Sequence, residues 1–194
     1  GATPPEQLFV LPREGGEPRK LTDLEVDVRA PAWRPDGEAL AFVANTHERD
    51  EHTYERADLW VVSLDGPLSR LTDDEYDYGS PAWSPDGRRI VAEGVAGLDV
   101  VIRERWDHGA PTDLWMFSAD GRERRNLTEE LDLIPAGPRW SPDGRWIYFT
   151  AQIGGSTHLF RIAVSGGCRS HVEGKVQSPW PRNAVALRGE IESQ

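Results

Sequence analysis

The sequence predicts an all-β protein built from repeated β-hairpins. Short apolar runs alternate with turn residues, among them 19 glycines and 15 prolines in 194 residues, a distribution typical of many short strands. The motif Pro-x-Trp-x-Pro-Asp-Gly occurs three times, and an apolar run follows each copy. The copies are 31–37, 81–87 and 138–144.

The end of this motif predicts a tight turn between two strands. Proline presets φ at the first turn position, aspartate can cap the turn, and glycine accepts the positive φ that closes it. The runs that follow, 40–43, 90–92 and 147–150, predict a strand with one buried and one exposed face. The repeat residues are Trp33, Pro35, Asp36, Gly37, Trp83, Pro85, Asp86, Gly87, Trp140, Pro142, Asp143 and Gly144.

A second hairpin alternates with the first along the chain. An apolar strand leads through a glycine-containing turn to a Leu-Thr pair, and Trp60 and Trp115 lie in two of these strands. The strand and Leu-Thr positions are 8–11 with 21–22, 59–62 with 71–72, and 114–117 with 127–128. A fourth copy, 159–162, has His171 and Val172 where Leu-Thr is expected.

Two hairpins per repeat make a four-stranded unit of roughly 40–50 residues, the size of one propeller blade. The predicted fold is therefore a partial β-propeller of about three to four four-stranded antiparallel blades. Each motif tryptophan is expected to pack between neighbouring blades; a carbohydrate-binding platform is the alternative. The predicted segments are a half-blade at 7–22, blades at 31–72, 81–128 and 138–173 within residues 1–175, and a non-matching tail at 176–194.

The blade motif resembles a known group of propellers. Trp-Ser-Pro-Asp-Gly, alternating apolar residues, Asp-Leu-Trp and a turn before Leu-Thr resemble the TolB-like (PD40, WD40-like) blades. The stretches 7–23, 41–45 and 56–62 are similar to the propeller of acylaminoacyl-peptidase-like serine peptidases of the prolyl oligopeptidase family (S9). The resemblance covers roughly residues 7–167 and implies a propeller that accompanies a hydrolase domain.

The sequence departs from those peptidases in its catalytic part. Their nucleophile lies in a Gly-x-Ser-x-Gly elbow, and this pentapeptide is absent from the 194 residues. We therefore expect a truncated, non-catalytic propeller without catalytic residues. The tail at 176–194 lacks the blade pattern, which is the basis for a hypothesis that the gene was disrupted there.

Charge and composition limit the partners. The net charge of −11 disfavours binding to nucleic acid and to anionic membranes. The single cysteine, Cys168, cannot form a disulfide within the chain and is expected to be a bystander thiol. No secretory signal is recognised, so a cytoplasmic location is expected.

Three segments hold candidate binding residues, and none predicts a cofactor or metal site. Residues 46–52 are expected to form a solvated loop, with adventitious metal binding as the alternative. Residues 73–79 resemble a calcium loop with the glycine displaced, so an acidic connection between blades is expected. Residues 103–108 are expected to form an exposed hairpin of mixed charge or, alternatively, a binding surface.

An incomplete ring leaves two blade faces without a neighbour. Known propellers use about 4–8 blades, and exposed apolar blade faces favour association. A homo-oligomer, most simply a dimer, is therefore expected. The alternatives are a protein-interaction module and a propeller subunit that a separate hydrolase chain completes into a serine peptidase.

Overall fold

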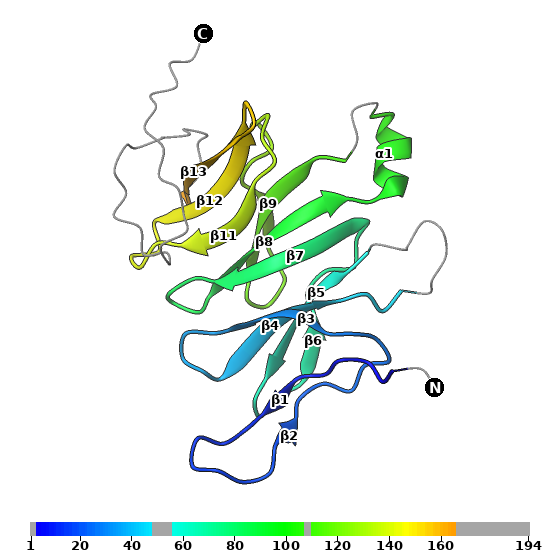
Figure 1. Cartoon of the computed structure of the whole chain (residues 1–194), viewed down its shortest axis with the longest axis vertical. Helices are drawn as coiled ribbons and strands as arrows, with labels where there is room; N and C mark the ends of the chain where they lie inside the picture. Colours follow the sequence, from blue (N-terminus) through cyan, green and yellow to red (C-terminus); the bar gives the residue numbers. More distant parts are fainter. Residues whose placement is uncertain (1–2, 48–55, 107–109, 166–194) are drawn as a thin grey trace.

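The chain folds into three antiparallel sheets and an N-terminal hairpin (Figure 1). The computed structural model describes residues 3–47, 56–106 and 110–165. The hairpin pairs β1 (Phe9–Val10) with β2 (Arg19–Lys20). The first sheet contains β3 (Arg29–Trp33), β4 (Ala39–Ala44), β5 (Asp58–Ser63) and β6 (Leu68–Arg70). The second contains β7 (Tyr76–Trp83), β8 (Arg89–Ala96), β9 (Thr112–Ser118) and β10 (Arg124–Asn126), and the third β11 (Ala136–Trp140), β12 (Trp146–Ile153) and β13 (Ser156–Ala163).

Within each sheet the strands follow one another in chain order, each antiparallel to the one before. Four-stranded sheets of this kind, packed face to face, are the blades of a propeller. The predicted all-β, partial propeller fold is confirmed. The fourth strand expected near His171 and the tail at 176–194 lie outside the described residues.

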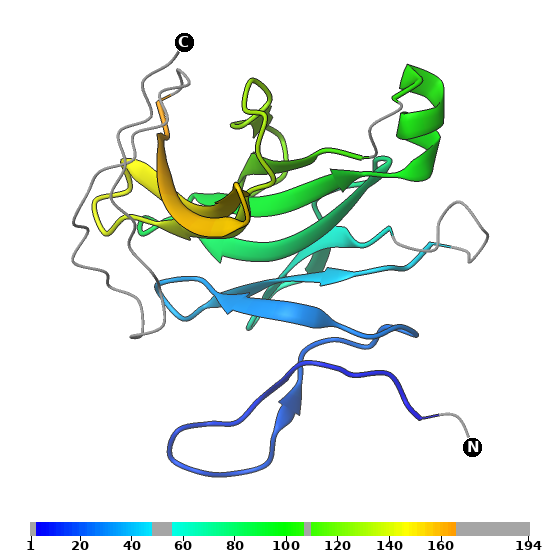
Figure 2. The ribbon, with the colours of Figure 1, turned by 45° about the horizontal axis from the view of Figure 1, so that its top comes forward.

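The sheets stack in the order of the chain, from the N-terminal hairpin to β11–β13 (Figure 2). β7 lies against the first sheet, and β11 lies against β7 and β8. Three apolar clusters fill the spaces between successive layers. They are centred on Phe42 under the N-terminal hairpin, on Phe117 between the first and second sheets, and on Phe149 between the second and third.

The expectation that the second strand of each blade has one exposed face is wrong for β4. All six residues of β4 are buried. Ala39, Ala41 and Val43 belong to the cluster against the second sheet. Leu40, Phe42 and Ala44 belong to the cluster against the N-terminal hairpin. A strand covered by a layer on each side reads as a continuous apolar run, because neither of its faces reaches water.

The first strand of each sheet contains a bulge at the residue before the motif proline. Ala30, Ser80 and Gly137 have φ values of 51°, 49° and 63°. The register of each strand with its neighbour shifts at this position. The left-handed conformation is strained for an L side chain, so Ala30 and Ser80 carry a cost that Gly137 does not.

The connection between β8 and β9 contains a helix, α1 (Leu98–Glu104), where an exposed hairpin was expected from 103–108. Asp99 in the first turn and Arg103 in the last turn suit the helix dipole. The side chain of Val100 is buried, and Arg105 ends the helix in a left-handed conformation. Asp107 and His108 lie outside the described residues.

Candidate interaction surfaces

Two motif tryptophans join neighbouring sheets through the same hydrogen bond. The indole N–H of Trp83 donates to the carbonyl of Ala32 in the first sheet at 3.1 Å. The indole N–H of Trp140 donates to the carbonyl of Ala82 in the second sheet at 3.0 Å. In both pairs the acceptor is the residue directly before the tryptophan of the preceding sheet, so the contact repeats from blade to blade.

A guanidinium group from the preceding sheet covers each of these indole rings. The guanidinium carbon of Arg34 lies 5.9 Å from the ring centroid of Trp83, and that of Arg89 lies 5.1 Å from the ring centroid of Trp140. Such cation–π contacts favour Arg over the face of Trp. A complete contact between blades therefore contains an apolar layer, a backbone acceptor and a cation.

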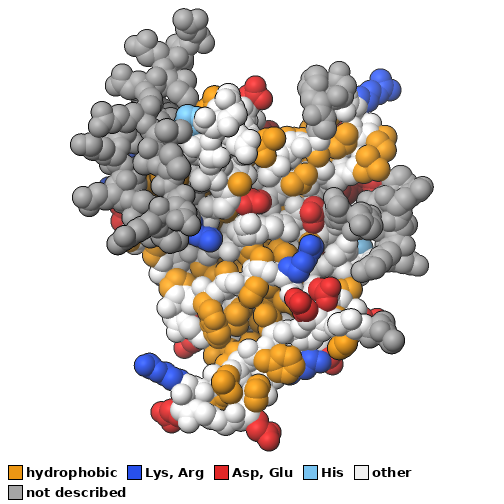
Figure 3. Space-filling view, in the orientation of Figure 1, with side chains coloured by type: hydrophobic (Ala, Val, Ile, Leu, Met, Phe, Trp, Pro, Cys, Tyr) orange, Lys and Arg blue, Asp and Glu red, His pale blue; other side chains and the backbone are white. Residues whose placement is uncertain are grey.

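Trp33 has the same position in the first sheet but a different environment. Its side chain is 51% exposed, whereas Trp83 is 7% exposed. The whole of β3 is exposed or half-buried, whereas β7 of the second sheet buries three of its residues. Within the described ranges, the Trp33 indole N–H donates no hydrogen bond, whereas those of Trp83 and Trp140 do. Figure 3 shows hydrophobic side chains gathered over the lower half of the molecule, where Figure 1 places β1 and the first sheet.

The Pro-Asp-Gly turns are built alike. Gly37, Gly87 and Gly144 have φ values of 77°, 67° and 68°, which only glycine adopts without strain. The Asp143 carboxylate accepts hydrogen bonds from the Ser141 hydroxyl at 2.5 Å and from the Arg145 N–H at 3.1 Å. These bonds lower the pKa of Asp143 to about 2. The pKa of Asp86 is lowered mainly by the Ser84 hydroxyl and that of Asp36 mainly by Arg34. The turn prolines are Pro35, Pro85 and Pro142.

The two other repeat tryptophans lie within the sheets. Trp60 stacks on Phe42 with ring centroids 6.4 Å apart and donates its N–H to the Ala44 carbonyl at 3.3 Å. Trp115 packs edge-on against Tyr76, with centroids 5.2 Å apart. Its buried indole nitrogen has no hydrogen-bond partner in the described part of the chain. Trp60 contacts the neighbouring strand β4, and Trp115 contacts β7, which lies two strands away in the same sheet. Both side chains also pack against the apolar clusters between successive layers.

A buried carboxylate links the Asp-Leu-Trp and Leu-Thr sequences. Asp58 is fully buried and accepts the Thr72 hydroxyl at 2.9 Å. It also contacts Nε2 of His47 at 2.8 Å and Nε of Arg70 at 3.2 Å. Burial raises the pKa of Asp58, and the Thr72 hydrogen bond and the charges of Arg70 and His47 oppose this rise.

The same link recurs in the second sheet. The Thr128 hydroxyl donates to Asp113 at 2.7 Å and accepts the N–H of Leu114 at 2.9 Å. Sequence reasoning missed this carboxylate–hydroxyl pair, although the recurrence of Asp before Leu-Trp together with Leu-Thr was the signal for it. The pair ties the third strand of a blade to the end of the fourth.

Only Thr46 and His47 of the segment 46–52 are described. The His47 side chain is mostly shielded from solvent, unlike a side chain of a solvated loop. Its imidazole is held against buried Asp58. Residues 48–55, including His52, lie outside the described residues. Across 3–47, 56–106 and 110–165, no three His, Cys, Asp or Glu side chains gather as a metal site would require.

Residues 73–75 of the acidic segment 73–79 connect β6 to β7, and residues 76–79 begin β7. Three of its carboxylates pair with arginines. Asp73 pairs with Arg70, and Asp74 pairs with Arg124 of the second sheet. Glu75 pairs with Arg103 of α1. Asp77, the fourth carboxylate of the segment, accepts the N–H of Ala57. The segment therefore joins the first and second sheets through ion pairs and a backbone hydrogen bond.

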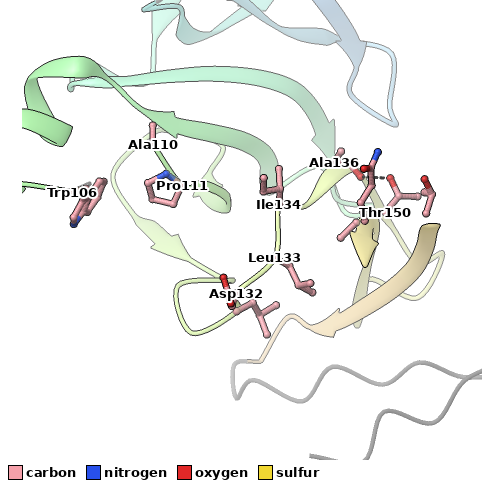
Figure 4. A pocket seen from close by; sticks show the side chains of 12 residues that line it. Trp106, Ala110, Pro111, Asp132, Leu133, Ile134, Ala136 and Thr150 are labelled. Atoms are coloured by element: carbon pink, nitrogen blue, oxygen red, sulfur yellow. Dashed lines mark hydrogen bonds between the residues drawn. The ribbon is translucent and has the colours of Figure 1, made fainter. Parts of the chain in front are cut away.

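An apolar hollow of about 910 Å³ opens at the end of the molecule that carries α1. Figure 4 shows Trp106 and Pro111 on one side of it and Ala136 and Thr150 on the other, with Ile134 between them. Ile134 is 70% exposed. The other lining residues are Ala110, Leu131, Asp132, Leu133, Ala151, Gln152 and Thr157.

The described helix is too short to cross a membrane.

The fold and the repeated blade contacts define a segment of a β-propeller of the type found in TolB and in prolyl oligopeptidase-family peptidases. TolB from Acinetobacter baumannii is 22% identical with a TM-score of 0.59, and the match covers 88% of this chain and 38% of TolB. An acylaminoacyl peptidase in complex with a chloromethyl ketone is 18% identical with a TM-score of 0.55, covering 85% of this chain and 27% of the peptidase. These likenesses show the fold.

A curated relative points to the same group. The chain is 28% identical over 151 residues to the uncharacterized peptidase YuxL of Bacillus subtilis, which covers 76% of this chain. The chain spans 18% of that peptidase. No protein-family model matches the chain. The resemblance to TolB-like and peptidase propellers drawn from the blade motif is thus confirmed.

Proposed function

We propose that this chain is a non-catalytic, peptidase-type propeller module that associates with a second copy through its open blade faces. The observation that carries the proposal is the exposure of Trp33, because the equivalent Trp83 is enclosed by a neighbouring sheet. The matched peptidases resemble this chain through their propellers, which are not their catalytic domains.

Self-association is supported by the kind of surface that the first sheet presents. Phe9, Leu11 and Trp33 are all more than half exposed on β1, its turn and β3. A large exposed aromatic ring surrounded by apolar residues is a typical anchor of a protein interface.

Multi-angle light scattering over a range of micromolar concentrations tests the proposal. The wild-type chain is expected to be dimeric, and Trp33→Asp is expected to shift it to monomer. Ile134→Asp, which changes an even more exposed side chain at the hollow, is the matched control and is expected to remain dimeric. A wild-type chain that is monomeric throughout this range contradicts self-association.

The hollow supports a second candidate, a protein-interaction module. Its lining is mainly apolar, with Asp132, Thr150, Gln152 and Thr157 as polar groups, a composition typical of binding sites. In this case Ile134→Asp abolishes capture of a specific partner, whereas Trp33→Asp leaves it intact.

An assay on acylated amino-acid anilides tests the non-catalytic part of the proposal. The purified chain is expected to show no turnover above background. Turnover that a serine-directed inhibitor blocks would overturn it and favour the peptidase alternative, in which a separate hydrolase chain supplies the active site.

A further inference from the structure

The hollow beside α1 has an apolar side chain that its own loop holds outward. Leu131 and Leu133 pack against the apolar cluster between the second and third sheets. Asp132 and Ile134, which alternate with them, are exposed. The N–H of Leu131 donates to the Thr128 carbonyl at 2.7 Å, which fixes the start of this segment. The buried leucines therefore keep Ile134 at the hollow (Figure 4), although its burial would be favourable.

The wall formed by the β12–β13 hairpin is equally fixed. Ala151 is buried, and Gln152 pairs with Thr157 across the two strands. The Thr150 hydroxyl donates to the Ala136 carbonyl of β11 at 3.2 Å. The hollow is thus built by paired strands and an anchored loop, so that it is preformed for a ligand.

Exposed apolar surface continues from the hollow to α1. The backbone N–H of Trp106 donates to the Val101 carbonyl at 3.0 Å, which places Trp106 against the last turn of the helix. Leu98 and Ile102 are exposed and lie one turn apart on the same helix face. Their separation along the helix axis is about 6 Å. Figure 3 shows hydrophobic side chains on and beside α1. An occupant that covers this surface as well as the hollow is therefore a chain segment.

Unpaired carboxylates gather on one side of the hollow. Glu129 and Glu130 are exposed in the turn that leads into it, and Asp132 lines it. Within the described part of the chain, none of the three forms an ion pair, whereas three carboxylates of the segment before β7 pair with arginines. Arg105 adjoins Trp106 on the opposite side. The side at residues 129–132 is therefore complementary to a cation.

We propose that the hollow binds a peptide segment of a partner protein in which apolar side chains stand next to Lys or Arg. This partner chemistry rests on the second candidate function, the protein-interaction module, and states what that module recognises. The apolar side chains lie among Trp106, Pro111 and Ile134, and the cation pairs with Asp132 and Glu130. An acidic segment of the same shape is repelled by these carboxylates, which supplies the specificity.

The probe is a blocked heptapeptide, acetyl-Gly-Leu-Phe-Leu-Lys-Lys-Gly-amide. One matched peptide has Glu in place of both Lys residues, and another has Ser in place of Leu, Phe and Leu. NMR titration of the full chain follows the indole N–H of Trp106, which Trp106→Phe assigns. The apolar cationic peptide is expected to bind at least about tenfold more tightly than either matched peptide, because each lacks one of the two contacts.

Variants of the hollow locate the binding. Ile134→Ser removes an apolar contact without adding charge and is expected to weaken binding by about tenfold. Glu130→Gln together with Asp132→Asn is expected to weaken it by about threefold to tenfold at low salt and to reduce its salt dependence. The matched control, Glu14→Gln together with Glu17→Gln, changes two exposed carboxylates of the N-terminal hairpin and is expected to bind as the wild type does.

The other outcomes separate this partner chemistry from the module itself. Equal binding of the Lys and Glu peptides, both weakened by Ile134→Ser, retains the hollow as a binding site and overturns the cationic partner. Binding of the Lys peptide that Ile134→Ser leaves unchanged, or that the Glu14 and Glu17 control weakens equally, reflects general attraction to the net charge of −11 and overturns the site.

Failure of all three peptides to bind at millimolar concentration also overturns the peptide site. Capture of a specific folded partner that Ile134→Asp abolishes would then still support the second candidate function. Trp33→Asp is expected to bind the Lys peptide as the wild type does, so the result is independent of self-association through the first sheet.

Discussion

Trp83 and Trp33 stand at the same position of two successive sheets, and only one of them has a complete environment. Trp83 donates to Ala32, lies under Arg34 and is 7% exposed. Trp33 is 51% exposed and faces the open side of the first sheet. The motif residue is identical in both, so its burial depends on whether a preceding sheet is present. The tryptophan of a blade thus stabilises the contact with the blade before it.

The largest expected effect comes from removing the enclosed tryptophan. Trp83→Ala is expected to lower the free energy of unfolding by about 3–5 kcal/mol, because it leaves a cavity between two sheets and an unpaired Ala32 carbonyl. Trp33→Ala is expected to cost about 1 kcal/mol or less. Urea unfolding at a concentration at which the chain is monomeric measures both. Equal losses for the two variants under these conditions would show that Trp33 is enclosed within the monomer.

The first and second sheets also differ in their buried carboxylates. Asp58→Ala is expected to lower the free energy of unfolding by about 2–3 kcal/mol, because Thr72 and Arg70 lose a buried acceptor. Asp113→Ala, at a less buried site, is expected to cost about 1 kcal/mol. Urea unfolding of the two variants checks this order. A larger loss for Asp113→Ala would contradict the role given to burial.

The repeat could be predicted because its signals are local. Each Pro-Asp-Gly turn and each alternating or apolar run depends on residues close together in the chain, and the sheets occur where these signals lie. The complete burial of β4 could not be predicted, because it depends on layers contributed by both neighbours. The helix α1 was missed because its few apolar residues also fit a strand.

The candidate surfaces depend on contacts between distant residues, and sequence reasoning found them less well. The position of Trp33 in the motif was evident, but its exposure depends on the layers around it, since no inner strands lie beside it among the residues that the structure describes. Asp58 and Thr72 are 14 residues apart, and nothing local marks their hydrogen bond. Arg34 lies over Trp83 only after the two sheets have packed.

The bulges before the motif prolines allow a smaller test of how alike the blades are. Gly137 has φ 63° with no atom near the position of an added Cβ, so Gly137→Ala tests backbone strain alone. It is expected to lower the free energy of unfolding by about 1 kcal/mol. Ser80→Gly, the reverse change in the second sheet, is expected to be neutral or to stabilise by a few tenths of a kcal/mol. Thermal unfolding compares them, and destabilisation by Ser80→Gly of the same size would mean that its hydroxyl outweighs the strain.

The smallest expected effect is on the pH dependence of the third sheet's turn. The Ser141 hydroxyl, the Arg145 N–H and the Arg145 guanidinium hold the pKa of Asp143 at about 2, below its ordinary value of 3.8. A lowered pKa stabilises the fold where the carboxylate is ionised, so the contribution is complete above about pH 4 and is lost as the pH falls towards 2. Asp143→Asn is therefore expected to flatten the fall of the melting temperature over this range. Asp36→Asn acts in the same direction in the first sheet, where Arg34 is the main cause. Glu129→Gln, which changes an exposed carboxylate outside the Pro-Asp-Gly turns, is the control. An equal flattening in that variant would show that general charge rather than the Pro-Asp-Gly turn sets the slope.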